Sequence, residues 1–345
     1  MLTAKQIKEI RAHLNKAQSP LFFFDNDGDG LCSFLLLQRF IGRGKGVPIR
    51  TFPELSGDYA RKINELNADY VFVLDKPIVS QEFFKEIEQV NIPIVWIDHH
   101  QIDFSSIPKF VNYYNPLLNK KKTNEPVTHL CYGITKKEED EWISLVGSIC
   151  DNFVPGIYSK LQKNYPDLTI KSKDAAEIYY KSEFGKIAQM FNFALKDRTS
   201  NVITMIKFLM KVRNPHEILI ENKDNFLMHK RFEEINKKYQ KLLKKASDFP
   251  EDSKLIFFQY GGDLSISADI ANGLKYKFPG KIIVVAYISG TKANISMRGK
   301  KIREIALKAI KDLEDANGGG HEDAVGVRIK VEDLGKFREN LEGLI

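Results

Sequence analysis

Short apolar runs and amphipathic segments alternate along the first hundred residues. The apolar runs are LFFFD at 21–25, YVFVLD at 70–75 and PIVWID at 93–98. The segments between them, such as 80–90, have the spacing of surface helices. Apolar runs of about five residues that alternate with helical segments are typical of buried parallel strands joined by crossover helices. The pattern therefore predicts an α/β domain built on a parallel sheet.

The rest of the chain reads as a helical stretch followed by a second α/β pattern. Residues 126–153 and 172–247 have mainly helical periodicity, and the last of these helices is strongly charged. From residue 254 onward, apolar runs such as KLIFFQY and KIIVVAYI alternate again with helical segments. Because a polar helix buries little, this one is expected to join two domains. We predict a first domain over 1–190, a helical connector over 191–252 and a smaller α/β domain over 253–345.

Composition narrows the class of protein. The chain has 345 residues, of which 43% are hydrophobic and 28% charged, as in an ordinary globular protein of two domains. Its formal net charge of +7 favours an anionic partner, although a lysine-rich solvated surface accounts for the same value.

The cysteines and the apolar runs bear on the cellular setting. Cys32, Cys131 and Cys150 form no CxxC pair, which argues against a disulfide framework and a thiolate zinc site. There is no signal-peptide pattern and no run of roughly 20 apolar residues, so a soluble cytoplasmic protein without a membrane partner is expected.

Each apolar run of the first domain ends in an acidic residue, namely Asp25, Asp75 and Asp98. In open α/β sheets the ligand site lies outside the carboxyl ends of the strands, so these acids are expected in one cleft. The first acid opens the loop DNDGDG at 25–30, whose oxygens suit Mg²⁺, Mn²⁺ or Ca²⁺. An EF-hand starts with the same spacing but requires Glu where Leu36 stands, and a helix where LFFF reads as a strand. A plain turn is the remaining alternative.

The triplet Asp98-His99-His100 adds imidazole to these carboxylates and shifts the metal preference towards Mn²⁺, Fe²⁺ or Zn²⁺. Adjacent strand residues face opposite sides, so both histidines serve one site only if the strand ends there. With Asp75 and with Asp151 at the end of the run GSICD, they supply the ligands of a two-metal centre. Such a centre suits phosphodiester hydrolysis by in-line displacement.

Taken in order, the motifs of this chain resemble those of the DHH phosphoesterase superfamily. They are DNDGDG, Asp75, the Asp-His-His triplet, GSICD, NISMRG at 294–299 and GGGHEDAVG at 318–326. The resemblance implies a parallel-sheet catalytic domain with a helical extension, joined by a helical linker to a smaller substrate-binding α/β domain. It covers nearly the whole chain and is greatest with the short archaeal RecJ-like exonucleases.

The resemblance also implies roles for the residues of the first domain. Asp25 and Asp27 would hold the two metal ions, and Asp75 would bridge the ions. His99 and Asp151 would complete the coordination shell of one of them. In the same scheme the triplet is catalytic: His100 faces the substrate phosphate, and Asp98 orients a histidine, a role also open to Asp29. The chain departs from some relatives in having Phe23 and Phe24 where those carry a ligating histidine.

In the last domain the substrate-binding candidates are Ser296, Arg298, Gly318, Gly319, Gly320 and His321. Glycines expose backbone N–H groups to a phosphate, and a flexible turn that ends a helix at Asn317 is the alternative. Arg298 can fork two hydrogen bonds to phosphate. The resemblance implies that Arg298 and His321 reach across a cleft between the domains to hold the substrate's phosphates or terminus.

The function expected from these residues is single-strand-specific exonuclease activity in DNA repair or replication. We expect 3′ to 5′ hydrolysis of DNA, with RNA as an alternative substrate, two Mn²⁺ or Mg²⁺ ions, and a helicase or replication factor as partner. One alternative is an oligoribonuclease or cyclic-dinucleotide phosphodiesterase. Another is an inactive scaffold of a replication complex, which would have no need of clustered like charges.

Overall fold

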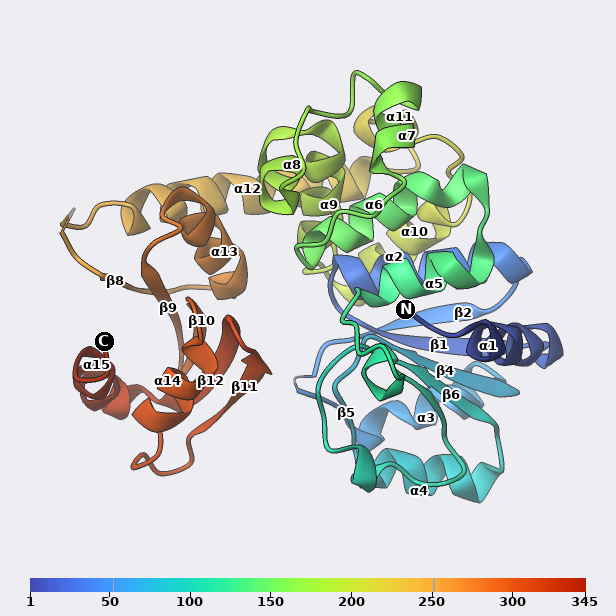
Figure 1. The fold of residues 1–345 in the computed structure, drawn as a ribbon, viewed down its shortest axis with the longest axis horizontal. Helices are drawn as coiled ribbons and strands as arrows, with labels where there is room; N and C mark the ends of the chain where they lie inside the picture. Colours follow the sequence, from blue (N-terminus) through green and yellow to red (C-terminus); the bar gives the residue numbers. More distant parts are fainter. Residues whose placement is uncertain (52, 251) are drawn as a thin grey trace. The chain divides into compact units, whose positions relative to one another are not determined.

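Figure 1 shows the computed structural model of the chain, which describes residues 1–51, 53–250 and 252–345. The chain forms two compact units, Met1–Glu233 and Glu234–Ile345. Their boundary lies within helix α12 (Phe226–Ala246), so residues 191–233 of the predicted connector pack with the first unit. Within the described residues, no helix combines the length and the apolar character that a membrane crossing needs.

A five-stranded parallel sheet forms the centre of the first unit, as the apolar runs predicted. Its strand order is β2 (Lys45–Ile49), β1 (Pro20–Asp25), β4 (Tyr70–Leu74), β6 (Ile94–Ile97) and β7 (Asn112–Tyr114). All neighbouring strands pair in parallel. Because parallel strands end at one edge, the residues that follow β1, β4 and β6 come together there.

Helices cover both faces of this sheet (Figure 1). Successive side chains of β1 point to alternate faces. Phe22 and Phe24 belong to one apolar cluster, and Phe23 belongs to the other. The first cluster includes residues of α1 (Ala4–Lys16), α2 (Gly28–Ile41), α5 (Val127–Thr135) and α6 (Glu141–Cys150). The second includes residues of α3 (Arg61–Glu65) and α4 (Gln81–Val90).

A helical extension completes the first unit. It consists of α7 (Tyr158–Asn164), α8 (Ala175–Lys181), α9 (Glu183–Ala194), α10 (Thr199–Leu209) and α11 (His216–Leu219). Helix α9 packs on α6 and α2, with Phe184, Met190 and Phe191 in the same apolar cluster as β1. A small two-stranded sheet of β3 (Glu54–Leu55) and β5 (Ile78–Val79) lies outside the main sheet.

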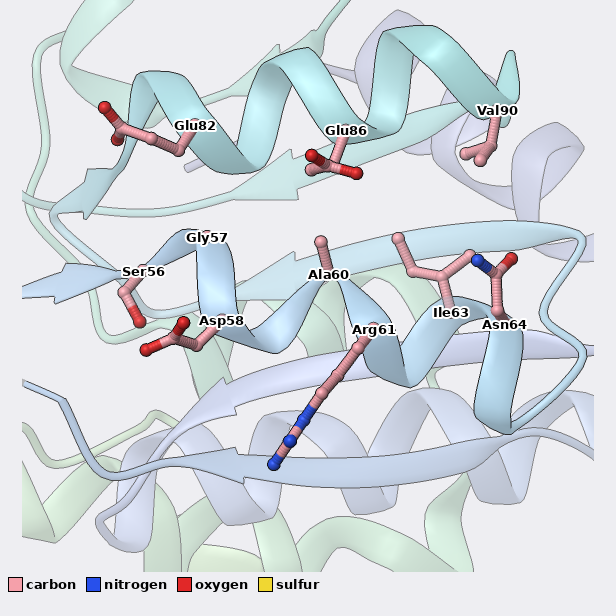
Figure 2. Close-up of a pocket in the computed structure, with 10 residues that line it drawn as sticks. All are labelled: Ser56, Gly57, Asp58, Ala60, Arg61, Ile63, Asn64, Glu82, Glu86 and Val90. Carbon is pink, nitrogen blue, oxygen red and sulfur yellow. The ribbon is translucent and has the colours of Figure 1, made fainter.

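Figure 2 shows a hollow of about 610 Å³ between α4 and the segment formed by α3 and the short helix η1 (Gly57–Tyr59). Both polar and apolar side chains line it, with Asp58, Glu82 and Glu86 among the polar ones. None of the candidate site residues lines it, so the proposed chemistry lies elsewhere in the unit.

The second unit is a mixed five-stranded sheet, which confirms a separate C-terminal α/β domain. The order is β11 (Asn317–His321), β12 (Ala324–Lys330), β10 (Lys292–Arg298), β9 (Ile282–Ser289) and β8 (Leu255–Gly261). Only β8 and β9 pair in parallel among these strands. Helix α13 (Ser267–Lys277) packs on β9 and β10, while α14 (Ile302–Ala309) and α15 (Leu334–Glu342) contribute to the apolar cluster that contains Ile295 and Met297.

The glycine run is not the turn at the end of a helix that was the alternative prediction for it. Helix α14 ends at Ala309, and Asn317–His321 form the edge strand β11. Gly320 has φ of 139°, and a Cβ there would lie 2.4 Å from the Ala324 carbonyl oxygen. Only glycine fits this backbone position.

Candidate metal centre

The turn from β1 into α2 places two carboxylates side by side. Asp25 is the last residue of β1, and Asp27 is the N-cap of α2, where its Oδ1 accepts a hydrogen bond from the Gly30 N–H at 2.9 Å. A Cβ on Gly30 would lie 2.4 Å from the Asp25 carbonyl oxygen, so glycine is what allows α2 to begin this close to the strand. The DNDGDG run is therefore a strand-to-helix turn and not an EF-hand.

Asp75 follows β4, next to β1 in the sheet, and it turns the chain there. Its backbone lies in the left-handed region with φ of 59°, which aspartate tolerates better than most residues, and its N–H donates to the Ile97 carbonyl at 3.0 Å. The residue is 2% exposed. Asp75 Oδ1 lies 3.4 Å from His99 Nε2, and it accepts no hydrogen bond from the described residues.

His99 joins two of the acids. Its Nε2 lies 3.4 Å from Asp75 Oδ1 and 3.3 Å from Oδ2 of Asp151, the residue that caps the C-terminus of α6. One ligand atom from each of Asp29, Asp75 and His99 lies within 4.8 Å of the others. The structure thus brings residues from three separate motifs to one buried point.

The other histidine of the triplet forms a pair with Asp98. His100 Nδ1 lies 2.7 Å from Asp98 Oδ1, and the His100 N–H donates to Asp98 Oδ2 at 3.2 Å. The Tyr113 hydroxyl donates to the same Oδ2 at 3.2 Å. Asp98 thus has both oxygens engaged, and its contacts orient His100.

The electrostatics of this pair favour a charged imidazole. Burial alone would lower the pKa of His100, but the charge and hydrogen bond of Asp98, helped by Asp151 and Asp25, raise that pKa to about 9. Burial opposes the change in Asp98, whereas the His100 charge and hydrogen bond bring the pKa of this carboxyl below its usual value. A cation at His100 is suited to contact an anionic phosphate oxygen.

Asp29 holds a neighbouring helix with both of its oxygens. They accept hydrogen bonds from the Val127 and Thr128 N–H groups at 2.8 and 2.7 Å, at the first turn of α5. The first N–H groups of a helix have no partner within the helix, and Pro126 at the N-cap of α5 has no side chain that could accept from them. The Asp29 carboxylate takes the place of such a cap. The contacts of Asp29 therefore indicate a structural role, rather than the histidine-orienting role suggested from sequence.

The acids are crowded enough to require a compensating cation. Burial raises the pKa of Asp27 well above its ordinary value, and so do the charges of Asp25, Asp151 and Asp29. Burial likewise raises the pKa of Asp75, with further contributions from the acids around it. Carboxylates with one imidazole match the donors that Mn²⁺ or Mg²⁺ takes, so the residues fit a divalent metal centre.

The metal-free protein should lose stability as the pH rises from about 4 to about 7, between the unfolded and the folded pKa of Asp29. Burial and the Asp151 charge raise the pKa of Asp29 to about 7. Such a group stabilises the native state fully below its unfolded pKa, and this contribution is lost as the pH rises through the folded pKa. We expect the Tm measured by calorimetry in EDTA to fall by several degrees, and Mn²⁺ to reverse the fall by binding the native state. A Tm in EDTA that rises over this interval would contradict the expectation.

In the second unit, the sheet brings the polar candidates onto one face. Ser296 and Arg298 lie two positions apart on β10, and the register across β12 puts Gly319 in line with Ser296 and His321 in line with Arg298. The Ser296 hydroxyl contacts Ser267 of α13 at 2.9 Å. Arg298 Nε donates to the Asn272 side chain at 2.6 Å, so α13 borders this face. Gly318 faces the other side, where a Cβ would lie 3.1 Å from Val327.

Sequence reasoning missed three residues at the metal centre. Lys76 contacts Asp25 at 2.9 Å, Tyr113 contacts Asp98, and Asn115 donates to the His100 carbonyl at 2.9 Å. Asn115 is fully buried, and it also donates to the Tyr113 hydroxyl at 2.8 Å. The sequence signal for Tyr113 and Asn115 was the short run NYYN at 112–115. This run contains the three-residue strand β7, which is recognised as a strand only once its pairing with β6 is known.

Family models match both parts of the chain. The model of the DHH family, N-terminal domain, matches residues 21–149, and the DHHA1 domain model matches residues 252–345. No curated protein matches the sequence significantly.

Solved structures share the fold of the whole chain at low sequence identity. RecJ from Thermus thermophilus in complex with Mn²⁺ is 14% identical with a TM-score of 0.68, and the match covers 99% of this chain but 54% of that one. The same protein has also been solved with Mg²⁺. The exonuclease RecJ bound to manganese is 14% identical with a TM-score of 0.67, covering 100% of this chain and 94% of that one. The DHH domain of a member of the s1p family of ribosomal proteins is 16% identical with a TM-score of 0.71, covering 98% and 89%.

These matches agree with the residues described above. The acids and histidines of the centre lie within or next to the segment that the first family model matches, and the face with Arg298 lies in the second. The two family models therefore support the DHH superfamily, with a match to the DHH family, N-terminal domain, followed by a match to the DHHA1 domain.

Proposed function

We propose that the chain is a metal-dependent phosphodiesterase that acts as a single-strand-specific exonuclease of the short archaeal RecJ-like type. It degrades DNA from the 3′ end, with RNA as a second substrate, during DNA repair or replication beside a helicase or replication factor. The observation that carries the proposal is the meeting of Asp75, His99 and Asp151 at the carboxyl ends of the parallel strands. The RecJ structures among its structural neighbours support the choice of an exonuclease.

In this proposal the metal ligands are Asp25, Asp27, Asp75, His99 and Asp151, and the ions are two Mn²⁺, with Mg²⁺ as the alternative. When bound, two such ions lower the pKa of a water molecule and neutralise the charge that develops in an in-line displacement. His100 donates to an oxygen of the scissile phosphate, and Asp98 keeps its imidazole protonated and oriented.

The DHHA1 domain contributes contacts to the phosphates or terminus of the strand. Arg298 and His321 supply charged or hydrogen-bonding groups on one face of the sheet, next to Ser296 and Gly319. The edge position of β11 supports a role in binding, because an edge strand presents backbone N–H groups on its outer side. The formal net charge of +7 suits a polynucleotide.

The proposal is tested with end-labelled single-stranded DNA and RNA, a duplex and a circular single strand, incubated with Mn²⁺ and resolved on a gel over time. We expect a 5′-labelled strand to shorten progressively and the duplex and circle to remain intact. Cleavage restricted to dinucleotides or cyclic dinucleotides would replace the exonuclease by a small-substrate phosphodiesterase. Binding of the strand without any hydrolysis would indicate a scaffold.

Hydrolysis of long strands should depend more steeply on salt than hydrolysis of dinucleotides. A long strand releases many counterions when lysines and arginines contact its phosphates, and log K falls by about 0.7 per log unit of salt for each phosphate contacted. We expect kcat/KM for a long strand to fall steeply as salt is raised from roughly 50 to 200 mM. For a dinucleotide, kcat/KM should change little over the same range. Equal slopes for both substrates would argue against a polynucleotide as the natural substrate.

Replacing Arg298 by Ala should weaken substrate capture and leave the metals bound. Loss of a bidentate, charge-assisted contact costs about 1.5 to 3 kcal/mol, or roughly one to two powers of ten in kcat/KM. Arg298→Lys should recover part of this loss, because the charge returns without the fork. The measurements are kcat/KM on a short oligonucleotide and metal content by elemental analysis.

Arg338 provides the matched control for this prediction. It lies on α15, which packs with the other side of the sheet, and its Nε contacts Glu342 of the same helix at 2.8 Å. Arg338→Ala should hydrolyse the oligonucleotide at the unmodified rate. If Arg298→Ala does so as well, the proposed phosphate contact is absent.

A further inference from the structure

Lys76 places a buried ammonium group against one of the metal-binding acids. The residue follows Asp75 directly, and its side chain is 0% exposed. Its Nζ lies 2.9 Å from Asp25 Oδ1 and donates to the Thr51 carbonyl at 2.8 Å. The cation of Lys76 thus lies where Asp25 would otherwise offer this oxygen to a metal ion.

The fold holds this lysine firmly in place. The indole N–H of Trp96, a residue 2% exposed on the neighbouring strand β6, donates to the Lys76 carbonyl at 2.9 Å. The left-handed turn at Asp75 sets the direction of the chain just before Lys76. Since a buried ammonium that leaves its acceptors is costly, Lys76 is expected to stay on Asp25 and Thr51 when a metal binds nearby.

The two sides of the metal centre therefore differ in charge and in donors. On one side, His99 Nε2 lies 3.3 Å from Asp151 and 3.4 Å from Asp75, so an imidazole and carboxylates are available together. On the other side, Oδ1 of Asp25 already accepts from Lys76 and from the Asn26 N–H at 2.9 Å.

Strand β1 adds no nitrogen donor to the Asp25 side. Phe23 and Phe24, which precede Asp25, are both 0% exposed and pack in the two apolar clusters. Phe23 lies edge-on to Phe83 at 5.4 Å between ring centroids, and Phe24 stacks on Phe34 at 5.2 Å. A divalent ion at Asp25 would meet the repulsion of the neighbouring ammonium without a nitrogen ligand from β1 to offset it.

We infer that Lys76 makes the two metal positions unequal, with a tight position at Asp27, His99 and Asp151 and a weak position at Asp25. The weak position fills when an anionic phosphate adds negative charge beside it. Lys76 is thus a positioning residue that acts through Asp25 and sets how the centre is loaded. This inference rests on the metal centre of the proposed function and specifies the order in which its ions bind.

The experiment titrates Mn²⁺ into the metal-free full-length chain and follows binding by calorimetry and by electron paramagnetic resonance. Wild type should bind one ion tightly and a second at least about tenfold more weakly, as expected for a unit charge held a few ångströms away. At two equivalents its spectrum should be that of isolated Mn²⁺. Inorganic phosphate, the probe for the anion, should tighten the second step.

Two neutral replacements test the role of Lys76. Lys76→Met and Lys76→Gln should raise the affinity for the second ion by about tenfold or more, so that two equivalents of Mn²⁺ give the broadened spectrum of a coupled pair. Lys85, an exposed lysine on α4, supplies the control, because Lys85→Gln should behave as wild type. Circular dichroism checks the fold of each variant. A variant that does not fold is set aside, and the two-step isotherm of wild type then decides.

The outcomes separate this inference from the proposed function. Two ions that bind wild type with equal affinity, or neutral variants that leave the second affinity unchanged, would overturn the role of Lys76 while the metal centre stands. No binding of Mn²⁺ by any form would remove the metal centre and the inference together. A weak second ion in wild type that becomes tight in either neutral variant supports the inference.

Discussion

Replacing Asp75 by Ala is expected to lower kcat/KM for phosphodiester hydrolysis by at least about a thousandfold with Mn²⁺ present. Asp75 follows the central strand β4, and its Oδ1 lies 3.4 Å from His99 Nε2, which supports the proposal that this carboxylate bridges two ions. Without a bridge, two like-charged ions are not held close enough to act on one phosphate. The measurements are the rate on a short oligonucleotide and the metal content of the purified variant.

Two further variants show whether such a loss comes from the carboxylate or from the backbone. Asp75 has φ of 59°, and asparagine tolerates this conformation better than alanine does, so Asp75→Asn keeps the turn and removes the charge. Asp58→Ala, which replaces an exposed aspartate of η1, is the control and should hydrolyse the oligonucleotide at the wild-type rate. Hydrolysis by Asp75→Asn at close to the wild-type rate, with unchanged circular dichroism, would refute the bridging role.

The first domain could be predicted from sequence because its signals are local. Apolar runs such as LFFFD bury their side chains on both faces of the sheet, and this pattern alone identifies parallel strands. The acids at their ends then converge for topological reasons, since parallel strands end at one edge. His99 lies beside Asp75 and Asp151 because β6 ends at Ile97 and leaves the chain free to turn.

Other features depend on partners that are distant in sequence. Asp29 resembles Asp25 and Asp27 in the run DNDGDG, yet its oxygens bind the N–H groups of Val127 and Thr128, about a hundred residues later. Lys76 gives no sequence signal at all, because its burial follows from strand β1 lying beside β4. No local pattern distinguishes such residues from ordinary surface ones.

The glycine run shows the limit of residue preference as a guide. Glycine is depleted in strands, so GGGH favours a loop on composition alone. Pairing with β12 overrides that preference, because the neighbouring strand supplies the hydrogen bonds that hold Asn317–His321 extended. The candidates Gly319 and His321 nonetheless share a face with Ser296 and Arg298, as the backbone register requires.

The pair formed by Asp98 and His100 offers a test of the chemistry that is independent of the bridging carboxylate. Asp98 is fully buried, and it accepts from both the ring and the backbone N–H of His100. Its charge is what keeps the pKa of His100 at about 9 against the effect of burial. Without that charge, burial would dominate and the imidazole would be neutral in the weakly alkaline range.

Asp98→Asn should therefore reduce hydrolysis by about a hundredfold at pH 8 and by much less at pH 6. The loss of a buried charge partner costs about 3 kcal/mol, and this cost appears only at a pH where His100 of the variant has lost its proton. The measurement is the ratio of kcat/KM between variant and wild type from pH 6 to 9, together with metal content and circular dichroism. A purely structural defect would lower the rate by the same factor at every pH, since the fold does not follow the titration of one imidazole. A ratio that is independent of pH would thus rule out a charged His100 as the group that contacts the phosphate. A ratio that falls as the pH rises, with the metals still bound, would assign that contact to His100 and its support to Asp98.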